Sequence, residues 1–451
     1  MSLSIINATL FHLDPVRIEC GAIRAVGNRI DAAGTGVTAQ PGDDVIDAGG
    51  AVVLPGLVNG HTHLYSALAA GMPMPPIAPA DFHEILKFIW WRLDRAMDAE
   101  SIEVSARIGA MDAMACGTTT LIDHHASPNH IDGSLDLLER GIAEVGLRAI
   151  LCYEVTDRNG PARFEAGLFE NRRYLDKLRL NDPNGRFGAM VGAHAAFTLS
   201  DKSLLACAGL AEEYRSGLHI HVAEDPCDDK ICRQIHGLPL LDRLRNCGLL
   251  PPGEAAADSL IARSILGHGT HLSPADAARL SSIAAGIAHN PRSNMNNAVG
   301  YAPIRHMTRV MLGTDGIGGD MFNECRTAWF KYRDSCANGD AGLAPARFLD
   351  MLAHNARVAS GVLGVTLGRL EAGAAADLIL TNYVPATPLL SENAPAHFIF
   401  AMGPQHIDSV FIDGEAVFRD RTATRVNARA AREHAAHCAA GLWDRMQQLT
   451  A

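Results

Sequence analysis

The chain has 451 residues, of which 48% are hydrophobic, and its formal net charge is -11. A chain of this length can bury a large core, either in one barrel-sized unit or in two or three domains. It has no Lys/Arg-rich run and only five lysines among its 39 basic residues, so it lacks the basic footprint of a nucleic-acid binder.

The first fifty residues predict short strands separated by tight turns. Residues 4–6 and 24–26 are short apolar pieces. They are interrupted by Gly27-Asn28 and by the Pro-Gly-Asp-Asp sequence at 41–44. This pattern indicates a small N-terminal β unit rather than a helical one.

The middle of the chain contains eight β-branched or apolar runs, each followed by a longer segment with helical periodicity. Eight such units predict a TIM-like (β/α)₈ barrel over residues 56–365, in which reactive groups lie at the carboxyl ends of the strands. The runs are residues 52–58, 118–123, 148–153, 188–193, 218–222, 264–267, 286–288 and 310–313.

Polar side chains follow most of these runs, and in a barrel such strand ends converge on one mouth. Scattered structural histidines would not select strand ends so consistently. The residues are His61 and His63 at the first run, Asp123, His124 and His125 at the second, His194 at the fourth, His221 and Glu224 at the fifth, His268 at the sixth, His289 and Asn290 at the seventh, and Asp315 at the eighth.

Two histidine pairs have the spacing of metal ligands. Residues two apart on a strand point the same way, so His61 and His63 present both imidazoles to one side. Such a pair is half of a transition-metal site. His219 and His221 share a face for the same reason, and their spacing leaves open which of them completes the site.

The C-terminal region returns to the pattern of the first fifty residues, with short strands that end in turns. Residues 377–380 and 409–414 predict strands that end in turns. We expect residues 1–55 and 366–425 to meet in one small β-sandwich domain. Residues 426–451 predict an alanine-rich helix that packs on the outside.

The cysteines and the N-terminus point to a cytoplasmic protein. Ten cysteines are scattered between Cys20 and Cys438 without a Cys-x-x-Cys pair, as expected of reduced thiols. The N-terminus lacks the basic-then-apolar order of a secretion signal, and no apolar stretch reaches the ~18 residues that a membrane span requires. We therefore expect no membrane partner and no nucleic-acid partner.

Four motifs resemble the amidohydrolase superfamily. Residues 55–63 resemble its first-strand signature, 219–224 and 313–315 match its fifth- and eighth-strand motifs, and 368–378 resemble the return into its β-sandwich. The likeness spans nearly the whole chain and falls in the branch with cytosine deaminase, guanine deaminase and the triazine hydrolases. A closer likeness, to SsnA-type aminohydrolases, rests on residues 90–96, 122–128 and 313–322.

The resemblance implies one divalent metal ion held by His61, His63, His221 and Asp315. The family pattern favours His221 over its neighbour because it stands three residues before Glu224. Three neutral imidazoles and a carboxylate suit Zn²⁺, which we expect, and also Fe²⁺.

A second metal is not expected. Binuclear relatives hold it with a carboxylated lysine on the fourth strand. This chain has no lysine between Lys177 and Lys202, and the end of its fourth run offers His194 instead.

The reaction that the resemblance implies is hydrolytic deamination of a purine, pterin, pyrimidine or triazine-like heterocycle by metal-activated hydroxide. Asp315 would accept the proton of the water, Glu224 would act as proton donor, and His268 would polarise the water or the developing oxyanion. Residues expected to contact the substrate are Trp90, His124, His194, His289, Asn290 and Asp320.

Two alternatives remain open. Ring opening of a cyclic amide, or displacement of chloride, begins with the same attack, so the motifs do not separate these reactions from deamination. A non-catalytic scaffold is the remote alternative, disfavoured because all four ligands and Glu224 are present. The expected partner is a small heterocyclic substrate, and the resemblance implies a homo-oligomer, a dimer or a tetramer.

Overall fold

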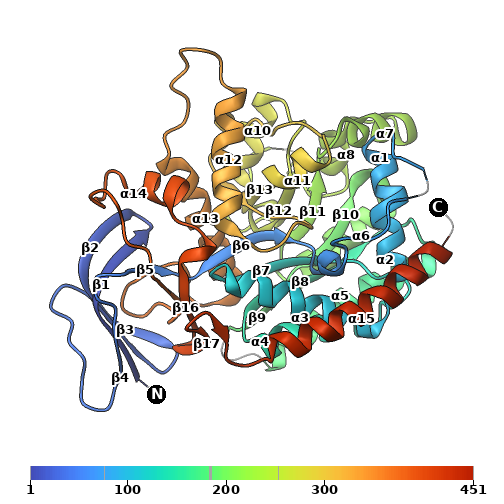
Figure 1. The fold of residues 1–451 in the computed structure, drawn as a ribbon. Coiled ribbons are helices and arrows are strands. Elements are labelled where there is room, and N and C mark those ends of the chain that lie inside the picture. Colours follow the sequence, from blue (N-terminus) through green and yellow to red (C-terminus); the bar gives the residue numbers. More distant parts are fainter. Residues whose placement is uncertain (1, 76, 182–184, 252, 450–451) are drawn as a thin grey trace.

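The computed structural model describes residues 2–75, 77–181, 185–251 and 253–449, which form a parallel barrel and a separate sheet built from both chain ends (Figure 1). This arrangement confirms the predicted fold class, a (β/α)₈ barrel with a β unit contributed by both ends. None of the helices in the described part of the chain is long and apolar enough to cross a membrane.

The end sheet has the strand order β18-β17-β16-β15-β5-β1-β2-β3, and β4 pairs with β1 outside this path. Sheet membership does not by itself define a folding unit, so the predicted domain boundaries stay a prediction. The strands are β1 (Ser2–Leu13), β2 (Val16–Val26), β3 (Arg29–Gly34), β4 (Asp44–Asp47), β5 (Val52–Pro55), β15 (Leu378–Thr381), β16 (Ile407–Ile412), β17 (Glu415–Arg419) and β18 (Thr422–Ala423).

The barrel strands are all parallel to their neighbours, in the order β6-β7-β8-β10-β11-β12-β13-β14, with β9 beside β8. A parallel bridge between Thr62 and Asp315 joins the first strand to the last. The strands are β6 (Leu57–Thr62), β7 (Thr118–His125), β8 (Arg148–Val155), β9 (Phe187–Ala189), β10 (Val191–Ala195), β11 (Leu218–Val222), β12 (Ile265–His268), β13 (Gly286–His289) and β14 (Val310–Leu312).

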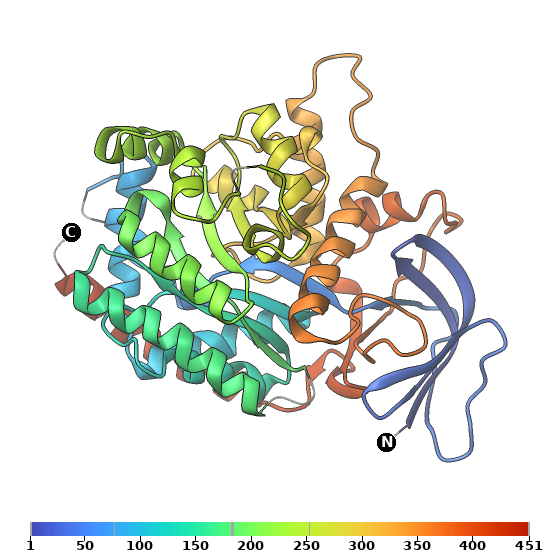
Figure 2. The same ribbon diagram turned by 180° about the vertical axis from the view of Figure 1, so that it is seen from behind.

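Helices surround the barrel on the outside (Figures 1 and 2). Their bounds are α1 (Phe82–Ile85), α2 (Trp91–Ala96), α3 (Ala99–Ala115), α4 (Ser134–Val145), α5 (Pro161–Asn181), α6 (Asp201–Glu213), α7 (Pro226–His236), α8 (Leu240–Asn246), α9 (Leu260–Arg263), α10 (Pro274–Ile283), α11 (Pro291–Asn296), α12 (Met321–Ser335), α13 (Ala346–Leu363), α14 (Ala394–Ala396) and α15 (Ala428–Gln448). Single turns of tighter or wider helix are η1 (Leu64–Leu68), η2 (Leu86–Trp90), η3 (Ala196–Thr198), η4 (Ile304–His306), η5 (His397–Ala401) and η6 (Pro404–His406).

The first predicted run, residues 52–58, is not one strand. Its first half is β5 in the end sheet, and its second half begins β6 in the barrel. Gly56 separates them, and a Cβ at this glycine would lie 2.3 Å from Thr119 Oγ1. The chain therefore passes between the sheets at a point where only glycine fits. Hydrophobic periodicity detects the apolar run but not the change of sheet.

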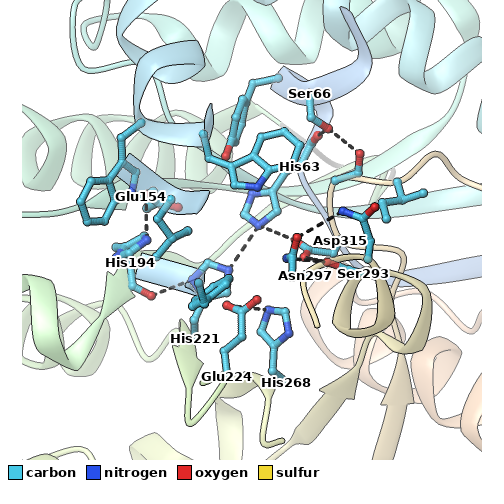
Figure 3. A pocket seen from close by; sticks show the side chains of 18 residues that line it. His63, Ser66, Glu154, His194, His221, Glu224, His268, Ser293, Asn297 and Asp315 are labelled. Carbon is cyan, nitrogen blue, oxygen red and sulfur yellow. Dashed lines mark hydrogen bonds and ion pairs between the residues drawn. The ribbon is translucent and has the colours of Figure 1, made fainter. Parts of the chain in front are cut away.

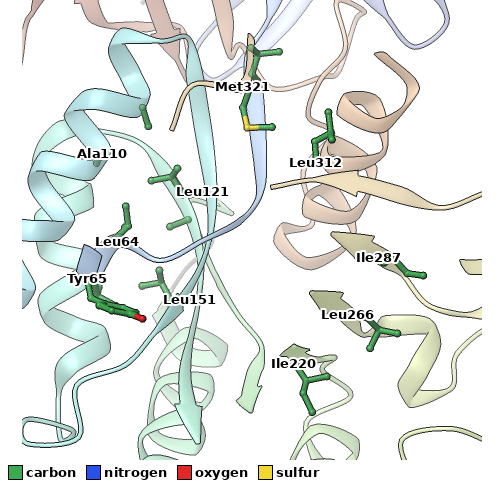
Figure 4. Close-up of a cluster of buried hydrophobic side chains, with 14 of the residues drawn as sticks. Leu64, Tyr65, Ala110, Leu121, Leu151, Ile220, Leu266, Ile287, Leu312 and Met321 are labelled. Atoms are coloured by element: carbon green, nitrogen blue, oxygen red, sulfur yellow. The ribbon is translucent and has the colours of Figure 1, made fainter. Parts of the chain in front are cut away.

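Neighbouring residues along the barrel strands belong to two different apolar clusters. Leu121 and Leu151 lie in the large cluster of Figure 4, whereas Ile122 and Ile150 lie in a smaller one. Because side chains alternate along a strand, Ile122 shares a face with His124, which points towards the other site histidines. The smaller cluster therefore forms an apolar floor inside the barrel beneath the histidines.

A buried arginine ties the barrel to the end sheet. The side chain of Arg148, at the start of β8, is fully buried and donates to Asp377 Oδ2 over 2.8 Å and to Asp377 Oδ1 over 3.0 Å. It also donates to Asp413. A guanidinium that fills such a site cannot be lost without leaving buried carboxylates unpaired.

We expect Arg148→Met to lower the free energy of unfolding by about 3–5 kcal/mol, because removal of one partner leaves buried charge uncompensated. The matched control is Arg429→Met, whose side chain is 90% exposed and pairs with Glu433 on the surface of α15. It should cost less than about 1 kcal/mol. Urea-induced unfolding measures both variants, and equal losses would contradict the prediction.

Candidate metal centre and active site

The four side chains predicted to bind a metal meet at the barrel mouth. Figure 3 shows three of them, His63, His221 and Asp315. His63 Nε2 lies 3.0 Å from Asp315 Oδ1 and 3.2 Å from His221 Nε2. His61 Nε2 lies 3.5 Å from the same carboxylate oxygen. One potential ligand atom of each residue lies within 4.8 Å of those of the other three. The set therefore surrounds a single point.

The remaining ring nitrogens of two of these histidines are held by main-chain carbonyls. His63 Nδ1 donates to the carbonyl of His124 over 2.5 Å, and His221 Nδ1 donates to the carbonyl of His194 over 2.7 Å. A neutral imidazole that carries its hydrogen on Nδ1 has a lone pair on Nε2. With both rings neutral, as metal binding requires, two such lone pairs lie beside the carboxylate of Asp315. This donor set fits a divalent cation with nitrogen and oxygen ligands.

His219 lies behind the ligand set rather than in it. Its Nε2 is 2.9 Å from His61 Nδ1, so it orients the imidazole of His61. The other nitrogen of His61, Nε2, has no hydrogen-bond partner among the described residues and faces Asp315. Of the two candidates on β11, it is thus His221 whose ring reaches the shared point.

Burial and one carboxylate set the charges of the cluster. Burial lowers the pKa of His61 to about 3 and holds that of His221 below its usual value. Burial acts on His63 in the same direction, but Asp315 outweighs it and raises the pKa of His63 to about 9. Against the effect of burial, His61 and His63 hold the pKa of Asp315 well below its usual range. Asp315 is therefore ionised, as a metal ligand must be.

Glu224 and His268 form a second pair at the edge of the cluster. Glu224 Oε2 lies 3.4 Å from His268 Nε2. Burial, followed by the nearby carboxylate of Asp315, raises the pKa of Glu224 well above its usual value. His268 Nδ1 lies 2.8 Å from Asn294 Oδ1, which can only accept, so the neutral ring has its lone pair on Nε2. The pair offers one proton donor and one acceptor.

A cavity opens above this cluster. Phe82 and Leu86, from the segment after η1, pack against Val299 on the other side of the mouth. Trp90 and Trp91 from the same segment line the cavity. Aromatic faces beside a few convergent polar groups suit a flat ring. Trp90 thus lies where a substrate contact was predicted.

The predicted substrate contacts divide into two groups. His194 lines the cavity together with Trp90, whereas the other four residues are not part of its lining. Each of the four has a separate environment. His124 Nε2 lies 3.0 Å from the His219 carbonyl, and His289 is fully buried with its ring 5.1 Å from that of Tyr301.

The other two residues lie at the starts of helices. Asn290 precedes α11, and its Nδ2 lies 3.4 Å from His268 Nδ1. Asp320 caps α12 by accepting from the Asn323 N–H over 2.9 Å.

Glu154 is the main site residue that the sequence interpretation missed. It stands near the end of β8, is 4% exposed and lines the cavity. The strand-end rule would have found it, since it follows the third run directly. Burial raises the pKa of Glu154, but His194, His124 and Arg158 outweigh burial and hold it below its usual range. Glu154 is therefore an ionised carboxylate inside the cavity.

The sequence interpretation also missed one serine and one asparagine that line the cavity. Ser293 Oγ donates to Asp315 Oδ2 over 2.5 Å, and Asn297 lies one helical turn further on; both line the cavity. They follow the seventh run, where the sequence pointed to His289 and Asn290 instead. No distinct sequence signal marks them, because serine and asparagine are common in such loops.

Known proteins resemble this chain in sequence and in fold. The model of the amidohydrolase family matches residues 52–417. The 5-methylthioadenosine/S-adenosylhomocysteine deaminase of Desulforudis audaxviator is 30% identical over 398 residues, 85% of each chain. Among solved structures, a zinc-bound adenosine deaminase from Xanthomonas campestris has a TM-score of 0.82 at 22% identity, covering 99% of both chains. Atrazine chlorohydrolase from Arthrobacter aurescens, in complex with zinc, has a TM-score of 0.81 at 20% identity, covering 97% of this chain and 100% of that one.

Proposed function

Since this chain belongs to the amidohydrolase family, we propose that it is a metal-dependent hydrolase that releases ammonia from an amino-substituted nitrogen heterocycle. The convergence of three imidazoles and Asp315 beside a buried Glu224 carries the proposal. The deaminase named above, which shares this family, supports the reaction class. The finer likeness to SsnA-type aminohydrolases, the cytoplasmic location and the homo-oligomeric state stay predictions.

We take Zn²⁺ as the ion that His61, His63, His221 and Asp315 would hold. Neutral imidazoles and a carboxylate are common zinc ligands, although Fe²⁺ accepts them too. The bound ion would supply Lewis acidity and lower the pKa of a water to about 7.

The side chains divide the proton transfers between them. Asp315, which is ionised, would accept the proton of the attacking water. The free Nε2 of His268 would orient that water by accepting its hydrogen bond. Glu224, whose pKa is raised by burial and by the nearby carboxylate of Asp315, would give its proton to the ring nitrogen next to the reacting carbon. The C–N bond to the amino group then breaks, and the departing amine leaves as ammonia after taking up a proton.

We expect the zinc-loaded protein to release ammonia from at least one member of a panel that contains guanine, adenine, cytosine, pterin, melamine and 5-methylthioadenosine. Removal of the metal with 1,10-phenanthroline should abolish the release, and added Zn²⁺ should restore it, because the ion activates the water. An enzymatic ammonia assay measures both. A product that keeps all of its nitrogens would replace deamination by ring opening, and activity that survives metal removal would contradict the proposal.

A further inference from the structure

The buried carboxylate of Glu154 has no part in the proton transfers proposed above, yet it lines the same cavity. Arg158 Nη2 donates to Glu154 Oε1 over 3.0 Å, and His124 Nδ1 lies 3.3 Å from Oε2. An ionised carboxylate has about four acceptor positions, so this one can still accept hydrogen bonds from a ligand. The guanidinium of Arg158 on Oε1 makes the carboxylate of Glu154 a poor ligand for a second cation.

Glu154 lies at the depth of the metal ligands. Its carboxylate, His194 and His221 each have a potential ligand atom within 4.8 Å of the others, and the same holds for Glu154, His124 and His63. A group this close to the ligands meets the reacting ring of a substrate. A sugar or side chain attached several bonds away would not reach it.

Glu154 and Glu224 occupy different sides of the ligand set. Glu224 groups with His268 and Asp315, whereas Glu154 groups with His194, and His221 lies between the two carboxyl groups (Figure 3). A ring placed over the metal would therefore have one edge towards each carboxyl group.

The two edges demand opposite chemistry from the ring. Glu224 gives a proton and needs a ring nitrogen with a lone pair. Glu154 can only accept, so it attracts a ring N–H and repels a lone pair. Both requirements are met by an amino-bearing ring carbon that has a ring N–H on one side and a ring nitrogen with a lone pair on the other.

We propose that Glu154 is a specificity-determining residue that accepts the ring N–H of a –NH–C(NH₂)=N– unit, the cyclic guanidine of guanine, isocytosine and pterin. This inference rests on the proposed function. In the reaction one water is consumed, the C–NH₂ bond is replaced by a carbonyl, and ammonia leaves, so the product unit is –NH–C(=O)–NH–. The amidine of adenine and its nucleosides has no ring N–H beside the reacting carbon and is a poorer fit.

The first test uses the unmodified zinc-loaded protein. Guanine and 1-methylguanine differ only at ring N1, where a methyl group replaces the hydrogen, and so do their products xanthine and 1-methylxanthine. We expect kcat/KM for guanine to exceed that for 1-methylguanine by about 10²-fold, since a hydrogen bond to a charged group is lost. Guanine should also be preferred over adenine. Equal rates, or a preference for adenine, would overturn the inference.

The second test assigns the preference to Glu154. Glu154→Gln should reduce the ratio of guanine to 1-methylguanine turnover by about 10-fold or more, because the neutral amide is a weaker acceptor. The control, Glu165→Gln, changes an exposed residue of α5 and should leave the ratio unchanged. An unchanged ratio in a folded, zinc-containing Glu154→Gln protein would overturn the inference.

A binding measurement separates failure of the inference from failure of the proposed function. If no compound releases ammonia, deamination itself fails. Calorimetry with xanthine and 1-methylxanthine on the zinc-loaded protein then still decides the role of Glu154. Tighter binding of xanthine supports it, and equal binding, or no binding of either, overturns it.

Discussion

Replacing Glu224 by glutamine should lower kcat/KM by about 10³-fold or more while the metal stays bound. Glutamine has the shape of the acid, but its amide cannot give a proton to a ring nitrogen, and general acid catalysis contributes about 10²–10⁴-fold. The structure favours glutamate as the proton donor, because burial and the nearby Asp315 raise the pKa of Glu224 well above its usual value. Ammonia release under saturating Zn²⁺ measures the effect.

Zinc content and a control variant distinguish loss of the proton donor from loss of the metal or of the fold. Metal analysis of Glu224→Gln should find the same zinc content as in the unmodified protein, because Glu224 is not one of the four residues that meet at the shared point. Glu165→Gln, on the exposed face of α5, is the matched control and should keep full activity. Near-normal turnover would remove Glu224 from the mechanism, and loss of zinc would assign it a ligand role instead.

The repeated pattern of apolar runs carried most of the fold prediction. Eight strand–helix units are visible in the sequence because each strand must be buried on both faces. The pattern could not show that residues 52–58 belong to two sheets, since β5 and β6 are both apolar and only the glycine between them marks the crossing. It also missed that the run at 188–193 splits into β9 and β10.

The candidate site followed from strand ends, and a strand end alone does not fix where a side chain points. A residue that ends a strand can point into the barrel or away from it, and a register difference of one reverses its direction. On β7, His124 points inwards towards the His219 carbonyl, whereas Asp123 accepts the main-chain N–H of Leu64. Asp320 is further from its strand and caps α12. Glu154 was missed although it obeys the same rule.

Backbone conformation at the site was not readable from the sequence either. His268 and Asp315 have φ values of 68° and 52°, in the left-handed region that residues other than glycine rarely adopt. Such strained positions concentrate at functional sites, where the surrounding packing holds them. Both residues belong to the proposed machinery, so strain and chemistry coincide at these two strand ends.

His221→Ala should abolish stable metal binding, whereas His219→Ala should only weaken it. His221 presents a free Nε2 to His63 and Asp315, so its loss removes a ligand. His219 touches the site through His61 Nδ1 alone, and loss of such a supporting group costs about 10–100-fold in metal affinity or activity. The two residues lie on the same strand and face, which makes each the control for the other.

Zinc content after dialysis, and titration with a competing chelator, distinguish the two variants. Thermal unfolding gives a second readout, because a ligand that binds only the folded state raises the melting temperature. Added Zn²⁺ should stabilise His219→Ala but leave His221→Ala unchanged. The opposite pattern would make His219 the ligand. His219 would then coordinate the metal directly instead of orienting His61. Because the carbonyl of His194 already fixes the ring of His221, the geometry supports the first outcome.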